Sequence, residues 1–322
     1  MGKVAKVQFA DSLKNEKIYL ASVSLGYDER NSEKIKAAFE THGFRVNTTY
    51  LAQRQTALGY VDSEQNRAHN LIQALLDDQV TYIWFVKGGW GAFNIYPYLC
   101  NEQKKIAAAK PKILIGFSDV TAVHYYINNV IQWPSVHGVL ALANKEMNRL
   151  LPALNINMES SILQVAEAID KGVSYSHLEP MNTLAFKGAR GVLSGGNMSV
   201  IQSFFNTKYE EHYRGKILLL EDVGIAVQQL DQSLHQLRYC ENFYPEGVVF
   251  GQFYGIEADN NEQELYRYVI REFSKKVNYP VYYYPKFGHG VLNSPFILAE
   301  KAEIYNNGVN TDFRLEQPSI LA

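Results

Sequence analysis

Short apolar runs and amphipathic stretches alternate along the first 130 residues of the chain. The apolar runs predict strands at 17–22, 44–50, 80–87 and 112–116. The amphipathic stretches predict helices at 32–42, 63–78 and 119–130. The continuous apolar character of 80–87 is typical of a strand buried on both faces. Strands that alternate with helices therefore indicate a parallel sheet with helices on both sides.

The pattern changes after residue 150. Strand-like segments follow at 190–193, 216–221, 247–253 and 280–284. Helical spacing occurs at 162–171, 197–205, 226–239 and 262–273. The stretch 172–187 mixes glycine, serine, asparagine, proline and threonine, which is typical of a connection. We therefore predict an α/β protein with an N-terminal α/β domain at 1–165, a linker at 166–187 and a C-terminal β-rich α+β domain at 188–322.

Composition narrows the class of protein. Of 322 residues, 47% are apolar and 20% are charged, as expected of a globular chain. The 31 Lys and Arg residues are balanced by 33 Asp and Glu residues, so we predict no nucleic-acid partner. No apolar run reaches the length of a membrane span, and the first ten residues lack the apolar core of a signal peptide. Because Cys100 and Cys240 form no C-x-x-C pair either, we expect a cytoplasmic protein without a membrane partner.

The common metal and nucleotide motifs are absent from the sequence. There is no H-E-x-x-H and no cysteine–histidine cluster with zinc spacing. Neither G-x-G-x-x-G nor G-x-x-x-x-G-K-[ST] occurs. We therefore predict no metal and no cofactor.

The strongest chemical signal is the sequence IGFSD at 115–119. A buried strand ends at Gly116 and a helix begins just after Ser118, so the serine lies at the carboxyl edge of the sheet, where α/β proteins bind ligands. The N–H groups of the next turn point outward there and suit an oxyanion. This arrangement resembles a nucleophile elbow, although position 120 is Val. The plainer alternative is that Ser118 caps the helix and Asp119 complements its dipole.

A glycine-rich loop, KGGWG at 87–91, follows the preceding strand in the chain. Glycines at a strand end allow a ligand to approach the backbone closely. If the two strands are neighbours, an N–H of this loop and that of Asp119 face the same carbonyl group. A tight turn that needs positive φ is the alternative explanation.

A nucleophilic serine requires a base and an acid that orients it. His289 lies between Gly288 and Gly290, which free the backbone to aim its ring, whereas His137 ends a predicted strand and is a second candidate. Glu221 ends the strand at 216–221 and supplies the acid, since Asp222 points to the opposite face of an extended chain. A metal hydrolase that uses His137 and His289 has no support from the spacing of carboxylates and histidines.

Six motifs in order resemble the LD-carboxypeptidase family. They are GGWG at 88–91, IGFSD at 115–119, HG at 137–138, LSGGN at 193–197, LLLEDVG at 218–224 and FGHGVLN at 287–293. This family of serine peptidases includes murein tetrapeptide carboxypeptidases and microcin C immunity peptidases. Phe117 and Trp90 stand where the family commonly has tyrosine, and Val139 replaces a common proline.

The resemblance implies roles for five residues. Ser118 is the nucleophile, His289 the general base and Glu221 the acid that orients it. The backbone N–H groups of Gly89 and Asp119 form the oxyanion hole. Because the serine lies in the N-terminal domain and the other two side chains in the C-terminal one, the domains must dock to assemble the triad. The resemblance also implies a homodimer.

The implied activity is removal of the terminal D-alanine from murein tetrapeptide, a small peptide substrate, in cell-wall recycling. One alternative is an immunity-type peptidase that cleaves the amide of an aminoacyl-nucleotide antibiotic, and another is a non-catalytic peptide-binding protein. Candidate substrate-binding residues are Gly88, Trp90, Asn197 and Arg67. The plainer explanations are that Trp90 packs against the second domain, that Asn197 is a helix N-cap and that Arg67 forms a surface ion pair.

Overall fold

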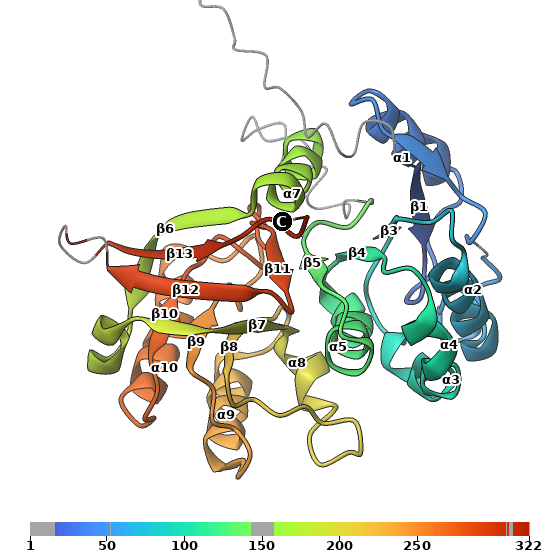
Figure 1. Ribbon diagram of the computed structural model, residues 1–322. Coiled ribbons are helices and arrows are strands. Elements are labelled where there is room, and N and C mark those ends of the chain that lie inside the picture. Colours follow the sequence, from blue (N-terminus) through green and yellow to red (C-terminus); the bar gives the residue numbers. More distant parts are fainter. Residues whose placement is uncertain (1–16, 52, 143–157, 307, 309–311, 322) are drawn as a thin grey trace, which may run out of the picture.

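Two β-structures lie side by side in the protein (Figure 1). The computed structural model describes residues 17–51, 53–142, 158–306, 308 and 312–321. One β-structure is a six-stranded open sheet and the other is a closed seven-stranded barrel. The open sheet is built from the first half of the chain and one late strand, and the barrel is built from the second half.

The open sheet has the strand order β11-β5-β4-β3-β1-β2. Its strands are β1 (Lys17–Ala21), β2 (Arg45–Asn47), β3 (Tyr82–Phe85), β4 (Ile113–Gly116), β5 (Ser135–His137) and β11 (Phe296–Leu298). The first five run parallel, and β11 pairs antiparallel with β5. The predicted parallel sheet is therefore confirmed, with β11 as an addition from the C-terminal half.

Helices cover both faces of this sheet. They bury the side chains of β3, which are apolar on both faces of the strand. Ile83 and Phe85 pack with α2 in one core cluster, whereas Tyr82 and Trp84 pack with α1 and α7 in another. The helices and short helical turns of this half are α1 (Asn31–Glu40), α2 (Glu64–Leu76), η1 (Ala92–Ile95), α3 (Tyr96–Asn101), α4 (Gln103–Ala108), η2 (Ser118–Val120), α5 (Thr121–Tyr126), η3 (Ile127–Ile131) and α7 (Met158–Lys171). The Ser63 hydroxyl caps α2 by accepting the N–H of Asn66, so this helix begins where the sequence predicts.

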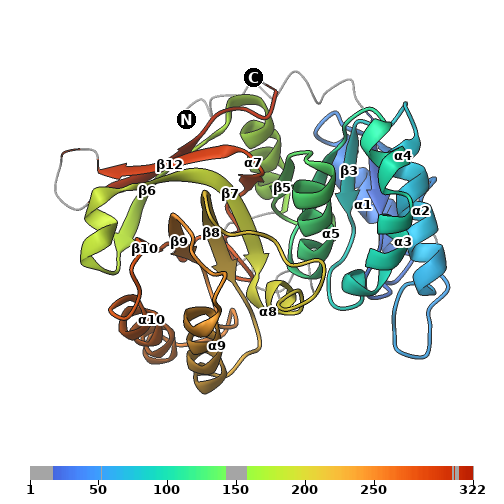
Figure 2. The same ribbon diagram turned by 60° about the horizontal axis from the view of Figure 1, so that its bottom comes forward.

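The barrel closes in the order β10-β6-β13-β12-β7-β8-β9. Its strands are β6 (Val173–Pro180), β7 (Ala189–Asn197), β8 (Lys216–Glu221), β9 (Gly247–Phe250), β10 (Val281–Tyr283), β12 (Lys301–Asn306) and β13 (Phe313–Gln317). The strands β7, β8, β9 and β10 are mutually parallel. The remaining helices and turns are η5 (Thr183–Lys187), α8 (Met198–Gln202), α9 (Val227–Tyr239) and α10 (Asn260–Ser274). Figure 2 shows α9 and α10 together against one side of the barrel.

The structure differs from the sequence prediction at 166–187, the expected linker. This stretch contains the second half of α7, all of β6 and η5. The strand β6 lies between its partners β13 and β10. Only Val173 and Leu178 of β6 are buried, because its polar side chains face away from the barrel core. Because of this polar composition, the sequence did not predict β6 as a strand. Among the described residues, no helix is both long and apolar enough to cross a membrane.

Candidate active site

Ser118 lies at the carboxyl edge of the open sheet, on the side that faces the barrel. It follows β4 through Phe117 and has a left-handed backbone with φ of 64°. A non-glycine residue in this region is strained, and such strain is common where a nucleophile is exposed on a strand-to-helix turn. The short turn η2 begins at Ser118, and α5 follows it. The hydroxyl therefore stands clear of the sheet, as the elbow interpretation predicts.

Two hydrogen bonds hold the strand end before Ser118. The Gly116 carbonyl accepts the N–H of Gly138 at 3.0 Å and lies 2.9 Å from Nε2 of His124. Burial lowers the pKa of His124 to about 4, so the ring is neutral and donates from Nε2. His124 therefore supports the turn and does not face the hydroxyl of Ser118.

The structure brings Ser118, His289 and Glu221 into one hydrogen-bonded chain. His289 Nε2 lies 2.9 Å from Ser118 Oγ, and its Nδ1 lies 2.7 Å from Glu221 Oε2. Glu221 is fully buried at the end of β8, and His289 lies in the loop between β10 and β11. The serine comes from the open sheet and the acid from the barrel, so the cluster exists only because the two β-structures are docked.

Glycine at position 288 permits the contact between the histidine loop and Glu221. Gly288 has φ of +110°, and a Cβ atom there would lie 2.9 Å from Glu221 Oε2. Its N–H donates to Asn293 Oδ1 at 3.0 Å, which closes the loop around His289. The glycine therefore lets the loop pass close enough for His289 to reach the carboxylate.

The glycine-rich loop after β3 packs directly against Ser118. A Cβ atom at Gly88 would lie 3.0 Å from Ser118 Cβ and 3.1 Å from its Oγ. The Asp119 carboxylate accepts the N–H of Ala92 at 2.9 Å and so joins this loop to the serine turn. Because β3 and β4 are neighbours, this loop and the turn at Asp119 lie at the same edge of the sheet, next to Ser118.

The electrostatics of the cluster favour a charged imidazole. Burial alone would lower the pKa of His289, but the Glu221 carboxylate and, beyond it, Asp222 raise that pKa above its ordinary value. Burial raises the pKa of Glu221, and the adjacent imidazole opposes this rise. The pair therefore stabilises the proton that His289 would receive from a serine.

The raised pKa of His289 predicts the pH dependence of any reaction that uses this ring as a general base. A general base must be neutral, and a raised pKa keeps the ring protonated to higher pH. We expect kcat/KM to be low in acid and to reach half its maximum above pH 6.5, the ordinary value for histidine. Measuring kcat/KM between pH 5 and pH 9 checks this, and a midpoint at or below 6.5 would contradict it.

The other residues predicted to bind substrate are hydrogen-bonded within the protein or exposed at its surface. Arg67 is only 1% exposed, and its Nη1 donates to the carbonyls of Val23 and Gly91, so it ties two loops together from beneath. Asn197 caps α8 through the N–H of Val200 and donates to Asp222 Oδ1 at 3.0 Å, as the N-cap alternative predicts. Trp90 is 70% exposed beside the site.

His137 does not line an open pocket. It is fully buried, and its ring lies 5.8 Å from that of Phe117 and 6.1 Å from that of Phe287. The Phe117 ring also lies 4.8 Å from the His289 ring, a packing contact that the sequence did not reveal. Burial lowers the pKa of His137 to about 3, so this ring is neutral and packs behind the catalytic candidates.

Polar contacts between the sheet and the barrel were also missed by sequence reasoning. Thr121 on α5 accepts the N–H of Asn197 at 3.0 Å. Lys216 of β8 donates to Asn129 Oδ1 at 2.7 Å and to the buried carboxylate of Glu211. The two views of the fold agree in placing α5 beside the barrel (Figures 1 and 2). These contacts fix the serine turn relative to Glu221.

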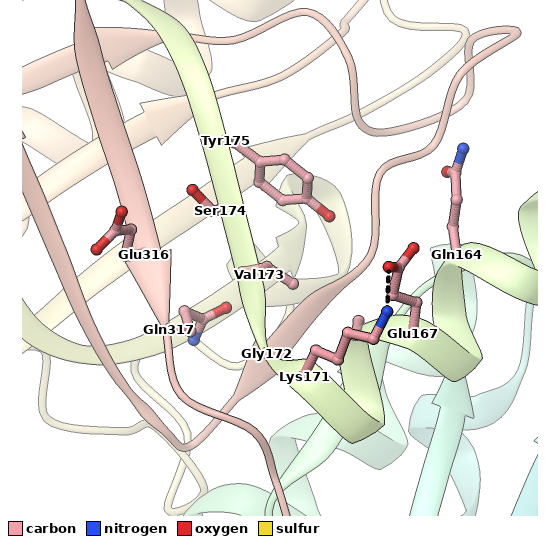
Figure 3. A pocket seen from close by; sticks show the side chains of 10 residues that line it. Gln164, Glu167, Lys171, Gly172, Val173, Ser174, Tyr175, Glu316 and Gln317 are labelled. Atoms are coloured by element: carbon pink, nitrogen blue, oxygen red, sulfur yellow. Dashed lines mark hydrogen bonds and ion pairs between the residues drawn. The ribbon is translucent and has the colours of Figure 1, made fainter. Parts of the chain in front are cut away.

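A hollow of about 540 Å³ lies away from this cluster (Figure 3). It opens between α7 and the neighbouring barrel strands β6 and β13. Its lysine, Lys171, pairs with Glu167 at 2.9 Å, and Tyr175 donates to the Pro295 carbonyl. Because these groups bond to one another or to the backbone, the hollow presents no catalytic arrangement comparable with that around Ser118.

Comparison with known proteins identifies two domains of one family in the chain. The model of the LD-carboxypeptidase N-terminal domain matches residues 18–138, and that of the C-terminal domain matches residues 190–304. A putative carboxypeptidase of Rickettsia prowazekii (strain Madrid E) is 30% identical over 75% of this chain and 73% of its own. The murein tetrapeptide carboxypeptidase of Pseudomonas aeruginosa is 25% identical over 83% of this chain and 86% of its own.

A solved structure has the same fold. It is that of an MccF-like protein from Bacillus anthracis str. Ames, with a TM-score of 0.76 and 19% identity over 94% of this chain and 97% of the other. Ser118 lies within the match to the N-terminal domain model, and Glu221 and His289 lie within the match to the C-terminal one. The chain belongs to the LD-carboxypeptidase family.

Proposed function

We propose that the protein is a serine carboxypeptidase that removes the terminal D-alanine of murein tetrapeptide, by hydrolysing an L,D-peptide bond, in cell-wall recycling. The observation that carries the proposal is the continuous chain from Ser118 Oγ through both nitrogens of His289 to Glu221. Membership of the family and likeness to a murein tetrapeptide carboxypeptidase support the substrate. The same proposal places the protein in the cytoplasm, where peptides of the wall are recycled, and makes it a homodimer.

The mechanism is acyl transfer. His289 takes the proton of Ser118 while Oγ attacks the scissile carbonyl, and Glu221 stabilises the imidazolium that forms. The backbone N–H groups of Gly89 and Asp119 stabilise the oxyanion. The imidazolium then protonates the leaving amine, so D-alanine departs and leaves an ester on Ser118. Water, activated by His289, hydrolyses this ester and restores the free enzyme.

Two substrates distinguish this proposal from its rivals. The purified protein is incubated separately with murein tetrapeptide and with an aminoacyl-sulfamoyl adenosine, and products are measured by mass spectrometry. We expect release of D-alanine from the tetrapeptide. Cleavage of the nucleotide amide alone would instead favour the antibiotic-immunity activity, since another structure with this fold is that of a microcin C7 self immunity protein, MccF. Hydrolysis of neither would favour a non-catalytic peptide-binding protein.

A further inference from the structure

A carboxypeptidase acts next to the free carboxylate of its substrate. In murein tetrapeptide, that carboxylate belongs to the D-alanine that leaves, only a few bonds from the scissile carbonyl. A partly buried cation beside the oxyanion loops would bind it through charge-assisted hydrogen bonds. Neither the triad nor the backbone N–H groups proposed for the oxyanion supplies such a charge.

Several other cations of the described residues already form ion pairs or are enclosed by the protein. Arg67 is 1% exposed and lies beneath the glycine-rich loop. Lys216 pairs with Glu211, and the exposed Arg30 pairs with Asp28. Lys286 lies on the histidine loop, with its ammonium 5.8 Å from the centre of the Tyr284 ring.

Lys87 differs from these side chains in place and in partners. It directly precedes Gly88, the residue that packs against Ser118. Its ammonium donates to the Gly26 carbonyl at 2.7 Å, and in the described part of the chain it forms no ion pair with a carboxylate. The only effect resolved on its pKa is a lowering by partial burial. An ammonium has three donors, so two remain for a ligand.

The ammonium of Lys87 lies beside the loop proposed for the oxyanion. Gly26 follows Leu25, whose N–H donates to the Gly88 carbonyl at 3.4 Å. Leu25 also packs so closely on the next glycine that a Cβ atom at Gly89 would lie 2.5 Å from its side chain. The loop after β1 therefore joins the Lys87 ammonium to the glycine-rich loop that packs against Ser118.

We propose that Lys87 binds the C-terminal carboxylate of the substrate and thereby restricts cleavage to the last peptide bond. This inference rests on the proposed function, because it concerns the carboxylate of the D-alanine that leaves. Among the described residues Lys87 has no carboxylate partner, so pairing this half-buried cation with a carboxylate contributes to binding of peptide acids and not of peptide amides.

The test compares murein tetrapeptide with the same peptide ending in D-alaninamide. In the wild-type protein, we expect kcat/KM for the acid to exceed that for the amide by about 10-fold to 100-fold, mainly through KM. Lys87→Met should abolish this preference and leave hydrolysis of the amide unchanged, whereas Lys87→Arg should keep it. Lys286→Met removes a charge from the opposite loop and should also keep the preference.

Three results would overturn the inference. The first is equal hydrolysis of acid and amide by the wild-type protein, and the second is an acid preference that persists in Lys87→Met. The third is an equal fall of kcat/KM for both peptides in Lys87→Met, which would show that Lys87 only holds the Gly26 carbonyl. If Lys87→Met does not fold, Lys87→Gln, which keeps a donor for that carbonyl, takes its place. Hydrolysis of neither peptide by the wild-type protein would overturn the proposed function itself, and this inference with it.

Discussion

Replacing Ser118 with alanine is expected to lower kcat for murein tetrapeptide by about 10,000-fold or more. The change removes only the hydroxyl that lies 2.9 Å from His289 Nε2. Under the proposed mechanism no acyl-enzyme then forms, and only the stabilisation of an oxyanion by backbone N–H groups remains. The folded structure should persist, because the alanine keeps the Cβ atom and leaves the docking contacts of α5 in place. Release of D-alanine, followed by chromatography, measures the loss.

A matched variant separates chemistry from general damage. Ser203 is an exposed serine whose hydroxyl donates to a backbone carbonyl within its own helical turn. Ser203→Ala should therefore keep wild-type kcat. Thermal unfolding of both variants should occur within a few degrees of the wild type. Activity of Ser118→Ala within 10-fold of the wild type would remove the serine from the mechanism.

Replacing Glu221 with glutamine is expected to reduce kcat by about 10,000-fold, by analogy with serine hydrolases in which the acid is neutralised. The carboxylate accepts the proton of His289 Nδ1 at 2.7 Å and so selects the tautomer whose Nε2 can accept from Ser118. A glutamine amide can instead present a donor to the ring and reverse that tautomer. Steady-state kinetics on murein tetrapeptide measure the effect.

The pH profile distinguishes orientation of the ring from mere disruption. The Glu221 carboxylate raises the pKa of His289, so in Glu221→Gln the midpoint of the remaining activity should move to lower pH. Glu316→Gln is the matched control, since Glu316 lies on β13 and accepts from Tyr305 at the barrel surface. An unchanged midpoint in Glu221→Gln, or a loss of less than 10-fold, would contradict the role of this acid.

Much of the open sheet could be predicted, because its central strand is apolar on both faces. Tyr82, Ile83, Trp84 and Phe85 are all buried, and no alternating pattern competes with that signal. The barrel was only partly predictable. β6 carries polar residues on its outer face, and β11 pairs with β5, a strand from the other half of the chain. Pairing over such separations leaves no local pattern.

The candidate triad could be predicted because each member has an unusual local setting. Ser118 closely follows the end of a buried strand, Glu221 ends another strand, and His289 lies between two glycines. Arg67 and Asn197 have no such distinguishing setting. A guanidinium or an amide can hydrogen-bond a loop or cap a helix as readily as it can bind a ligand. The structure shows Arg67 and Asn197 hydrogen-bonded within the protein.

The contacts that dock the sheet on the barrel could not be predicted. Thr121 and Asn197 are 76 residues apart in the chain, and Asn129 and Lys216 are 87 apart. Each side chain is ordinary in its own segment and acquires its role only when the two β-structures meet. Without these contacts the open sheet, which carries Ser118, would not be held against the barrel, which carries Glu221.

Covalent labelling of Ser118 tests the central claim most directly. The wild-type protein and its His289→Ala variant are treated with a fluorophosphonate, a serine-reactive probe, and the modified peptide is identified by mass spectrometry. If His289 activates Ser118, one adduct forms on Ser118 in the wild-type protein, and its formation is slowed strongly in the variant. No adduct, or an adduct on another serine with Ser118 unmodified, would contradict the account.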